Sequence, residues 1–343
     1  MSSFSDRVII WQRLKGRHSL PWQFGRDPYR IWLSEIMLQQ TQVATVIPYF
    51  LRFVTRFPDL LSLANASEDE VLALWSGLGY YSRARNLHKA ANRVMSAYGG
   101  RFPDTTHRLE ALPGIGRSTA AAIAALAFGQ SRAILDGNVK RVLSRHAGVS
   151  GWPGEKTVET RLWALAEARL PSKDIQPYTQ GLMDLGATVC TRARPACTTC
   201  PVASDCVALQ RGLTGSLPTA RPKKTLPEKQ VQMLIVLSGK KILLEKRPSS
   251  GIWGGLWSFP EIDPEADSIN YCKTVLGFDV DQGLSLPKLK HCFTHFRLYI
   301  SPLLLNVEPA QVDTSGARQR WFTKQDAKRT AVPSPVRKLL TQF

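Results

Sequence analysis

The sequence predicts a protein of two domains, in which an all-α domain precedes a smaller α+β domain. Residues up to 211 carry apolar side chains at helical spacing, with glycines and prolines in the gaps between the periodic stretches. From residue 230 onward, short β-rich runs replace that pattern. Between them, residues 212–229 contain three prolines and two glycines without apolar periodicity, which is typical of a linker. We therefore expect domains at 1–211 and 230–343.

Capping residues and spacing predict the helices of the first domain. Asp27 and Pro28 supply an N-cap acid and a proline at the first helical position, so a helix is expected to begin there and to cover residues 29–47, up to Pro48. The other periodic stretches predict helices at 68–75, 82–98, 118–128, 139–146, 156–170 and 178–185.

The second domain is predicted to contain a sheet with few helices. Runs at 231–237 and 241–246 flank Ser238-Gly239-Lys240, which is typical of a β-hairpin. Further strands are expected at 256–259, 297–305 and 318–322, and short helices at 265–276 and 335–341.

The charge balance favours a polyanionic partner. The chain has 343 residues and carries 45 Lys and Arg against 27 Asp and Glu, a net charge of +18, of which +13 lies in residues 1–226. Such an excess favours nucleic acid as the partner, and a basic but inert surface is the alternative.

Hydropathy and cysteine content indicate the cellular compartment in which the protein is expected. No apolar run reaches the roughly 18 residues that a membrane span needs, and the N-terminus lacks the pattern of a signal peptide. We therefore expect a soluble protein of a reducing compartment, the cytoplasm with its nucleoid. In such a compartment, six cysteines indicate a metal site or catalysis more often than disulfides.

Four cysteines lie close enough in sequence to surround one metal centre. Cys190, Cys197, Cys200 and Cys206 fall within seventeen residues, in the spacing C-x6-C-x2-C-x5-C. Four thiolates suit either tetrahedral zinc or a cubane iron–sulfur cluster. Zinc ribbons usually carry paired C-x2-C units, and only one is present here. Cys272 and Cys292 lack such spacing and are expected to be core thiols.

A glycine-containing turn precedes the predicted helix at 118–128. In Leu112-Pro113-Gly114-Ile115-Gly116, two glycines bracket an apolar residue, which lets backbone N–H groups point together toward a ligand. The positive end of the following helix dipole would add to the attraction of a phosphate. The alternative is a simple connection between helices.

Two carboxylates are candidates for acid–base chemistry. Glu35 has Ile31, Trp32 and Leu38 within one helical turn, so desolvation should raise its pKa and keep it protonated. Asp136 sits at the start of a helix near cations, which should keep it ionised. One protonated and one ionised carboxylate are what glycosidic bond cleavage needs. The alternatives are a buried structural glutamate and an aspartate that only caps its helix.

Together these motifs resemble the MutY-type adenine DNA glycosylases of the endonuclease III superfamily. The resemblance covers nearly all of residues 6–210 and, more loosely, the second domain. It is carried by LPW at 20–22, WLSEIMLQQTQVATVIPYF at 32–50, LWSGLGYYSRARNLHKAA at 74–91, LPGIGRSTA at 112–120, ILDGNVKRVLSR at 134–145, MDLGA at 183–187, the cysteine loop, RPSSGIWGGLWSFPE at 247–261 and FTHF at 293–296.

The resemblance implies a fold, a cofactor and a substrate. It implies an all-α helix-hairpin-helix glycosylase domain whose four clustered cysteines hold a 4Fe–4S cluster, followed by a Nudix-like domain. The implied reaction is removal of adenine opposite 8-oxoguanine or guanine in double-stranded DNA, by a monomer. The adenine would leave the base stack to reach the two carboxylates.

The resemblance also implies roles for single residues. Glu35 would protonate N7 of the adenine and Asp136 would stabilise the cationic sugar, with Asn138 orienting this machinery and Ser118 near the sugar. Residues expected to contact the DNA or probe the lesion are Gln39, Gln40, Thr41, Leu78, Tyr80, Arg83, Pro113, Gly114, Gly116, Thr294 and His295. Apart from the resemblance, the basic residues that flank the turn at 112–116 could supply further phosphate contacts: Arg83, Arg85, Lys140, Arg141, Arg192 and Arg194.

Two positions depart from related patterns. Bifunctional glycosylase/lyases carry a Schiff-base lysine where Ser118 stands, and serine has no amine to form an imine. Base excision without efficient strand nicking is therefore expected. The family often has serine in place of Thr294, which keeps a hydroxyl at that position.

Three other functions fit the sequence less well. An endonuclease III-like enzyme acting on oxidised pyrimidines does not fit Ser118 or the second domain. A nucleotide diphosphate hydrolase would need a Glu-rich metal-binding helix, and the acids after residue 261 are scattered. A non-enzymatic DNA-binding protein would not need Glu35 and Asp136 in these motifs.

Overall fold

The computed structural model describes residues 2–222, 225–308 and 318–342. The chain forms two compact units. Unit 1 comprises Met1–Asn65 with Asn86–Lys223, and unit 2 comprises Ala66–Arg85 with Lys224–Phe343. Segment 66–85, which the sequence groups with the helical domain, thus has its contacts in unit 2. Among the described residues, no helix is long and apolar enough to cross a membrane.

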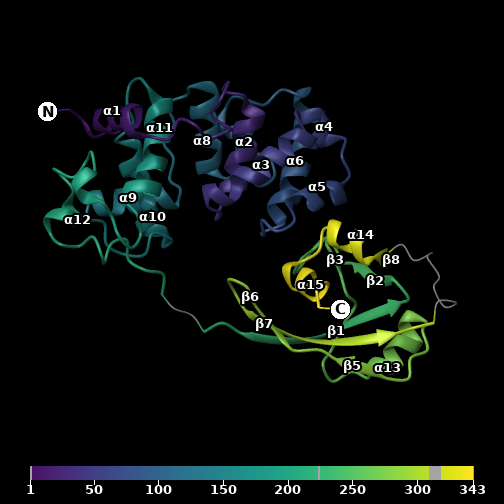
Figure 1. The fold of residues 1–343 in the computed structure, drawn as a ribbon. Helices are drawn as coiled ribbons and strands as arrows, with labels where there is room; N and C mark the ends of the chain where they lie inside the picture. The colour runs from purple at the N-terminus through teal and green to yellow at the C-terminus, as the bar shows by residue number, and fades with distance from the viewer. Residues whose placement is uncertain (1, 223–224, 309–317, 343) are drawn as a thin grey trace. The chain divides into compact units, whose positions relative to one another are not determined.

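The N-terminal two thirds of the chain is helical (Figure 1). Within residues 2–222 no strand is found, which agrees with the predicted all-α domain. The helices are α1 (Phe4–Lys15), α2 (Pro28–Leu38), α3 (Val43–Arg56), α4 (Leu60–Ala64), α5 (Glu68–Trp75), α6 (Ser82–Tyr98), α7 (Thr106–Glu110), α8 (Arg117–Phe128), α9 (Gly137–His146), α10 (Lys156–Glu167), α11 (Ile175–Asp184), η1 (Leu185–Val189), η2 (Cys197–Thr199) and α12 (Val207–Gln210).

The helix expected over 29–47 is in fact two helices. Asp27 caps α2 by accepting a hydrogen bond from the Tyr29 N–H, and Pro28 occupies the first turn, as predicted. The helix ends at Leu38 because Gln40 adopts a left-handed conformation, with φ of +58°. A new helix begins at Val43 and continues through Pro48 rather than stopping there. Glu35 therefore lies one turn before the end of α2.

The predicted linker is in part attached to unit 1. Leu217 is buried, and its carbonyl accepts a hydrogen bond from the Arg145 side chain. Thr219 accepts one from the Gly151 N–H, and Arg221 lies over the Trp152 ring. The first strand of the second domain begins at Glu228.

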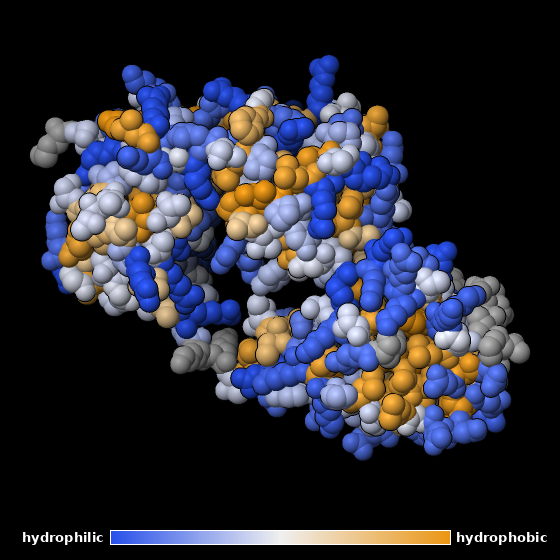
Figure 2. Space-filling view, viewed as in Figure 1, coloured by the Kyte–Doolittle hydropathy of each residue, from blue (hydrophilic) through white to orange (hydrophobic). Residues whose placement is uncertain are grey.

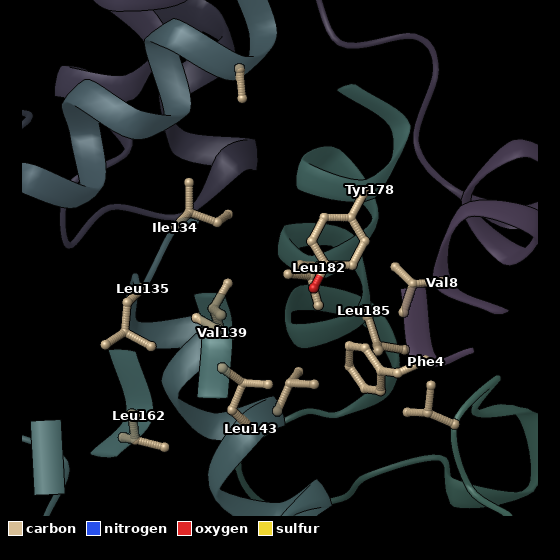
Figure 3. Close-up of a cluster of buried hydrophobic side chains, with 14 of the residues drawn as sticks. Phe4, Val8, Ile134, Leu135, Val139, Leu143, Leu162, Tyr178, Leu182 and Leu185 are labelled. Carbon is tan, nitrogen blue, oxygen red and sulfur yellow. The ribbon is translucent and has the colours of Figure 1, made fainter. Parts of the chain in front are cut away.

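A buried apolar cluster supports the start of α9 (Figure 3). Ile134 and Leu135, which precede the helix, and Val139 within it are almost fully buried. Residues of α1 and α11 close the cluster from the other side, among them Val8 and Tyr178. Asp136 lies between these apolar anchors, so packing on both sides fixes its backbone.

The second domain is built on one mixed sheet (Figure 1). The predicted hairpin forms, with β1 antiparallel to β2, and β1 also pairs in parallel with β7 over ten residues. The main strand order is β3-β2-β1-β7-β5, with β4, β6 and β8 pairing to β1, β7 and β2. The strands are β1 (Glu228–Ser238), β2 (Lys241–Lys246), β3 (Trp257–Ser258), β4 (Glu261–Ile262), β5 (Gly283–Ser285), β6 (Leu289–Cys292), β7 (Arg297–Asn306) and β8 (Gln319–Thr323).

Helices lie on both faces of this sheet. Along β1, Met233 and Ile235 belong to a core shared with α15, while Leu234 and Val236 belong to a core shared with η3. This alternation is what a strand buried on both faces shows. The helices are α13 (Ser268–Tyr271), η3 (Cys272–Leu276), α14 (Lys324–Arg329) and α15 (Ser334–Leu339).

The two remaining cysteines have different environments. Cys272 is buried beneath the sheet, as predicted. Cys292, in contrast, is exposed on β6, so its assignment as a core thiol was wrong. β6 lies at the margin of the sheet, where one side of a strand faces solvent, and its sequence LKHC gave no clear apolar alternation from which this could be predicted.

Candidate active site

Glu35 opens into a cavity of unit 1. The cavity has a volume of about 330 Å³ and is lined by residues of α1, α2 and α11 and by the segment that joins α1 to α2. The Glu35 side chain is half-buried, and no hydrogen bond to it is found among the described residues. The carboxyl group thus faces the cavity with both oxygens available to a ligand.

The environment of Glu35 favours the protonated form. Burial raises the pKa of Glu35 to about 8, and the negative charge of Asp136 adds to that shift. The predicted increase in pKa is confirmed. The two carboxylates are therefore close enough to influence each other, although a hundred residues separate them in sequence.

Asp136 is the N-cap residue of α9. Its carboxylate accepts a hydrogen bond of 2.8 Å from the Val139 N–H, and the Asn138 amide lies 3.4 Å from its other oxygen. The capping prediction is confirmed. Charge at this carboxylate is therefore stabilised by backbone donors and by the helix dipole.

The pKa of Asp136 departs from the prediction. Burial raises it, whereas the hydrogen bonds from Val139 and Asn138 and the charge of Arg141 act in the opposite direction. The sequence identified the stabilising donors but not the degree of burial. Asp136 is the more stabilised anion of the pair because its oxygens accept hydrogen bonds and those of Glu35 do not.

Ser118 and Asn138 contact the backbone and side chains around Asp136. The Leu135 N–H donates to the Ser118 hydroxyl at 2.9 Å, which connects the first turn of α8 to the residue before Asp136. The side-chain amide oxygen of Asn138 accepts a hydrogen bond of 2.8 Å from the Arg141 guanidinium. A Cβ at Gly186 would lie 2.5 Å from that of Asn138, which explains the glycine in the 183–187 motif.

Three polar residues that the sequence did not indicate lie at or behind the cavity: Arg17 and Gln180 line it, and Asp184 binds both. Asp184 is fully buried, and its carboxylate accepts hydrogen bonds from the Arg17 backbone and side chain and from the Gln180 amide. Because Asp184 pairs with Arg17, the atom of Gln180 facing it must be the NH₂ group. The Gln180 oxygen has no donor among the described residues. Asp184 lies in the MDLGA motif at 183–187, and that motif was the sequence feature that could have identified it as a site residue.

Gln39, Gln40 and Thr41 form the turn that ends α2. The Gln39 amide lies 3.5 Å from the Thr119 hydroxyl. Thr41 donates from its backbone to Leu38, and Gln40 is exposed in its left-handed conformation.

The turn at 112–116 is present as predicted. Leu112 and Ile115 are buried, while Gly114 and Gly116 are exposed. Gly114 has a φ of +79°, and a Cβ there would approach that of Asn86 to 2.9 Å. Gly116 begins α8 without a side-chain cap, so N–H groups of the first turn remain available to an anion.

Most of the basic residues named as further phosphate contacts have protein partners. Lys140 pairs with Glu159, Arg141 donates to the carbonyls of Cys190 and Gly186, and Arg83 is buried. Arg192 and Arg194 are exposed on the cysteine loop. On the face in Figure 2, hydrophilic side chains (blue) cover much of the surface.

The four clustered cysteines surround one cavity, which Cys190, Cys197, Cys200 and Cys206 all line. Burial, followed by the neighbouring cysteines, raises the pKa of Cys200 to about 11, so these sulfurs are mutually close. Within the described part of the chain, however, no three His, Cys, Asp or Glu side chains are grouped tightly enough to hold one metal ion. Four thiols around one cavity suit either metal centre that the spacing allows, zinc or an iron–sulfur cluster.

Two arginines of α9 connect Asp136's helix to the cysteine loop. Arg145 is almost fully buried, donates to the carbonyls of Thr191 and Arg192, and lies 3.4 Å from the Cys190 sulfur. Arg141 donates to the Cys190 carbonyl at 2.7 Å. The helix that Asp136 caps is therefore held by the loop that carries the thiols.

In unit 2, Leu78 and Tyr80 lie in a turn before α6. Leu78 is buried, and Tyr80 is 44% exposed. Arg83 is bound beneath this turn instead of reaching outward, since it donates to the Leu78 and Gly79 carbonyls. Its predicted surface contact with DNA therefore does not fit its position.

Thr294 and His295 form the exposed tip of the β6–β7 hairpin. A hydrogen bond from the Phe293 N–H to the Phe296 carbonyl closes the tip, and the two phenyl rings stack at 4.4 Å. Aromatic packing beneath thus presents the two polar side chains to solvent.

Both parts of the chain match known protein families. A profile described as "HhH-GPD superfamily base excision DNA repair protein" matches residues 33–168, and a NUDIX domain profile matches residues 231–342. The predicted fold class is confirmed. The described helices after residue 230 contain no Glu-rich segment, so the metal-binding helix of a nucleotide hydrolase is not found in that part of the chain.

Curated relatives match over the whole chain. The adenine DNA glycosylase of Buchnera aphidicola from Acyrthosiphon pisum is 37% identical over 99% of this chain and 97% of the relative. The human adenine DNA glycosylase is 35% identical over all of this chain and 74% of the relative.

Solved structures resemble the helical part. A thermostable thymine-DNA glycosylase is 30% identical with a TM-score of 0.55, covering 61% of this chain and 95% of that one. An endonuclease III in a non-covalent complex with DNA is 21% identical with a TM-score of 0.51, covering 61% and 94%, which supports the fold.

Proposed function

Because the chain belongs to the adenine DNA glycosylase family, we propose that it removes adenine opposite 8-oxoguanine or guanine in double-stranded DNA by hydrolysing the N-glycosidic bond. One observation carries the proposal. Glu35 faces the cavity, and its pKa is raised to about 8, so it keeps its proton at neutral pH. Part of this increase comes from the negative charge of the neighbouring Asp136. An acid beside an anion is the arrangement that cleavage through a cationic sugar requires.

The reaction would begin with a flipped adenine in the Glu35 cavity. The protonated Glu35 would donate its proton to adenine N7, which makes the base a better leaving group. As the C–N bond breaks, positive charge develops on the sugar, and ionised Asp136 would stabilise it. Water would then complete the hydrolysis, directly or after a covalent intermediate with Asp136. Asn138 and Ser118 would hold the Asp136 segment in place through the contacts described above.

The polar wall of the cavity suggests how adenine is recognised. Asp184 holds the Gln180 NH₂ group, so the Gln180 oxygen is left to accept a hydrogen bond from the exocyclic amine of adenine. A purine with a carbonyl oxygen in place of this amine would bind less well, because its oxygen and the Gln180 oxygen are both hydrogen-bond acceptors. Arg17, which Asp184 also holds, adds a donor to the same cavity.

Strand contacts and lesion reading would come from several loops. The turn with Pro113, Gly114 and Gly116 would bind a phosphate through N–H groups at the start of α8. Gln39, Gln40 and Thr41, with Leu78 and Tyr80, would probe the base opposite the adenine. Thr294 and His295 would inspect it from the second domain, which makes residues 230–343 a recognition domain and 1–211 the catalytic one. We propose that the protein acts as a monomer on DNA.

Cys190, Cys197, Cys200 and Cys206 would hold a 4Fe–4S cluster. Their common cavity and the family to which the chain belongs support such a cluster. When bound, the cluster would supply a rigid covalent crosslink of residues 190–206. The arginines of α9 would transmit that rigidity to the helix that Asp136 caps.

A single-turnover assay tests the function. Duplexes with adenine opposite 8-oxoguanine, and with adenine opposite thymine as the reference, are incubated with the protein and free adenine is measured. We expect release from the first duplex only. Glu35→Gln should abolish release while retaining DNA binding, and Glu110→Gln, at an exposed position, should behave like wild type. No release by the wild type, or a near-wild-type rate for Glu35→Gln, would contradict the proposal.

Trapping with borohydride tests the absence of lyase chemistry. Because Ser118 cannot form an imine, incubation with an abasic product and borohydride should yield little covalent adduct. Abundant adduct that disappears when Ser118 is replaced would refute a purely hydrolytic enzyme.

A further inference from the structure

The turn at residues 77–81 has an unusual backbone conformation. Gly77, Gly79 and Tyr80 all have positive φ values, of +102°, +75° and +48°. Glycine adopts such angles readily, but a residue with a side chain such as Tyr80 does so only with backbone strain. Something in the surrounding structure must therefore stabilise this turn, whose Tyr80 ring is among the more exposed large apolar side chains.

Arg83 makes the contacts that stabilise it. One guanidinium nitrogen of Arg83 donates to the carbonyls of Leu78 and Gly79, at 3.4 and 3.3 Å. The guanidinium carbon lies 5.3 Å from the Trp75 ring centre and 5.4 Å from that of Tyr80. Trp75 supports the same turn, because its indole N–H donates to the Gly79 carbonyl at 3.1 Å.

The position of Arg83 does not suit a phosphate ligand. Arg83 as a whole residue is only 8% exposed to solvent. Burial lowers its pKa to about 10, so it remains a cation at neutral pH and keeps its cation–π contacts. A phosphate contact would require the guanidinium to leave two carbonyls and two aromatic rings.

We propose that Arg83 is a positioning residue, which sets the Leu78–Tyr80 turn for insertion beside the mispair and contacts no phosphate itself. The proposal rests on the function proposed above, in that it assumes a damaged duplex as the ligand of the turn. Lysine cannot replace arginine here, because an ammonium group lacks the flat guanidinium face that packs against two rings while one of its nitrogens donates to two carbonyls.

A double-mutant cycle in DNA binding tests this role. The duplex carries 2′-fluoro-2′-deoxyadenosine opposite 8-oxoguanine, because fluorine disfavours the cationic sugar and so prevents cleavage. Dissociation constants of wild type, Arg83→Lys, Tyr80→Ala, their double variant and Arg83→Gln are measured between about 50 and 200 mM salt. Arg93→Lys, exposed on the same helix, is the matched control, and thermal unfolding confirms that each variant is folded.

We expect Arg83→Lys and Tyr80→Ala each to weaken binding about tenfold, and the double variant to be no more than about twofold weaker than Tyr80→Ala. The salt dependence of Arg83→Gln, which removes the charge, should equal that of wild type, and Arg93→Lys should bind within about twofold of wild type.

Two results would overturn the proposal. A decrease of about 1 in the salt slope of Arg83→Gln, which removes the charge, would identify a phosphate contact, and additive effects in the cycle would identify a general structural role. If Arg83→Lys is unfolded, Arg83→Gln, which retains a donor, replaces it in the same cycle. Adenine release by the wild type from the unmodified duplex is measured separately, so that failure of the function and failure of the Arg83 role are distinguished.

Discussion

Glu35 and Asp136 are two half-buried carboxylates whose surroundings differ in hydrogen bonding. Burial raises the pKa of both. Asp136 has a backbone N–H, a neighbouring amide and the start of α9 to stabilise its charge, whereas Glu35 faces a cavity from the last turn of α2 without such donors. Burial alone therefore does not assign roles to acids. The donors around each one decide which holds the proton and which the charge.

The strongest test of this difference removes the charge of Asp136 and keeps its cap. Asparagine caps a helix about as well as aspartate, so Asp136→Asn should change the free energy of unfolding by less than about 0.5 kcal/mol. Excision should nevertheless decrease at least ~10³-fold, because the neutral amide cannot stabilise a cationic sugar. Single-turnover rates and denaturant unfolding measure the two effects. Retained excision would mean that Asp136 serves only as a cap.

Disruption of the cysteine loop should destabilise the helix that Asp136 caps. Cys200→Ser is expected to lose the broad visible absorbance of an iron–sulfur protein and to lower the midpoint of thermal unfolding, because residues 190–206 hold Arg141 and Arg145. Affinity for duplex DNA should weaken about tenfold or more as this face loosens. Cys292→Ser, at an exposed position, is the control. Unchanged absorbance and stability would contradict a cluster at these thiols.

The role of the Glu35 cavity in recognising adenine can be tested with a substrate that lacks the exocyclic amine. Gln180→Leu should slow adenine excision about 10- to 100-fold, the value of one or two lost hydrogen bonds in a buried site. Excision of unsubstituted purine opposite 8-oxoguanine should change far less, since purine offers no amine to Gln180. An equal loss on both substrates would show that Gln180 acts on the fold of the cavity instead.

The pH dependence of excision should report both acids. Above a pH of about 8, Glu35 loses its proton and the single-turnover rate should decrease about tenfold per pH unit. At low pH the rate should decrease again as Asp136 becomes protonated. A rate that stays constant to pH 10 would exclude Glu35 as the proton donor.

Stability gives the smallest expected effect. The pKa of Glu35 is raised from an ordinary value near 4.5 to about 8 in the folded state. Protonated Glu35 therefore contributes stability below about pH 4.5, and this contribution is lost as pH rises to 8. Glu35→Gln does not titrate, so at pH 8 it should unfold with a free energy higher than wild type by ~1–2 kcal/mol. Urea unfolding at pH 5 and pH 8 measures the difference, and a wild type that is equally stable relative to Glu35→Gln at both pH values would contradict it.

Local sequence signals predicted the elements that depend on neighbouring residues. Residues 68–75 and 82–98 are helices with the predicted limits, and the hairpin around Gly239 forms where expected. The break between α2 and α3 was missed because the apolar periodicity continues through Gln40, and only the left-handed backbone there interrupts the helix. Short strands such as β4, with two residues, carry no pattern long enough to detect.

The sequence by itself determined which residues form the site, because Glu35, Asp136 and the four cysteines lie in motifs of characteristic spacing. Only the tertiary structure decided how they are used. The net pKa of Asp136, the orientation of the Gln180 amide by Asp184 and the buried position of Arg83 all depend on partners that other elements bring. The physical reason is that desolvation and hydrogen bonding are set by the atoms around a group, and distant parts of the chain supply those atoms.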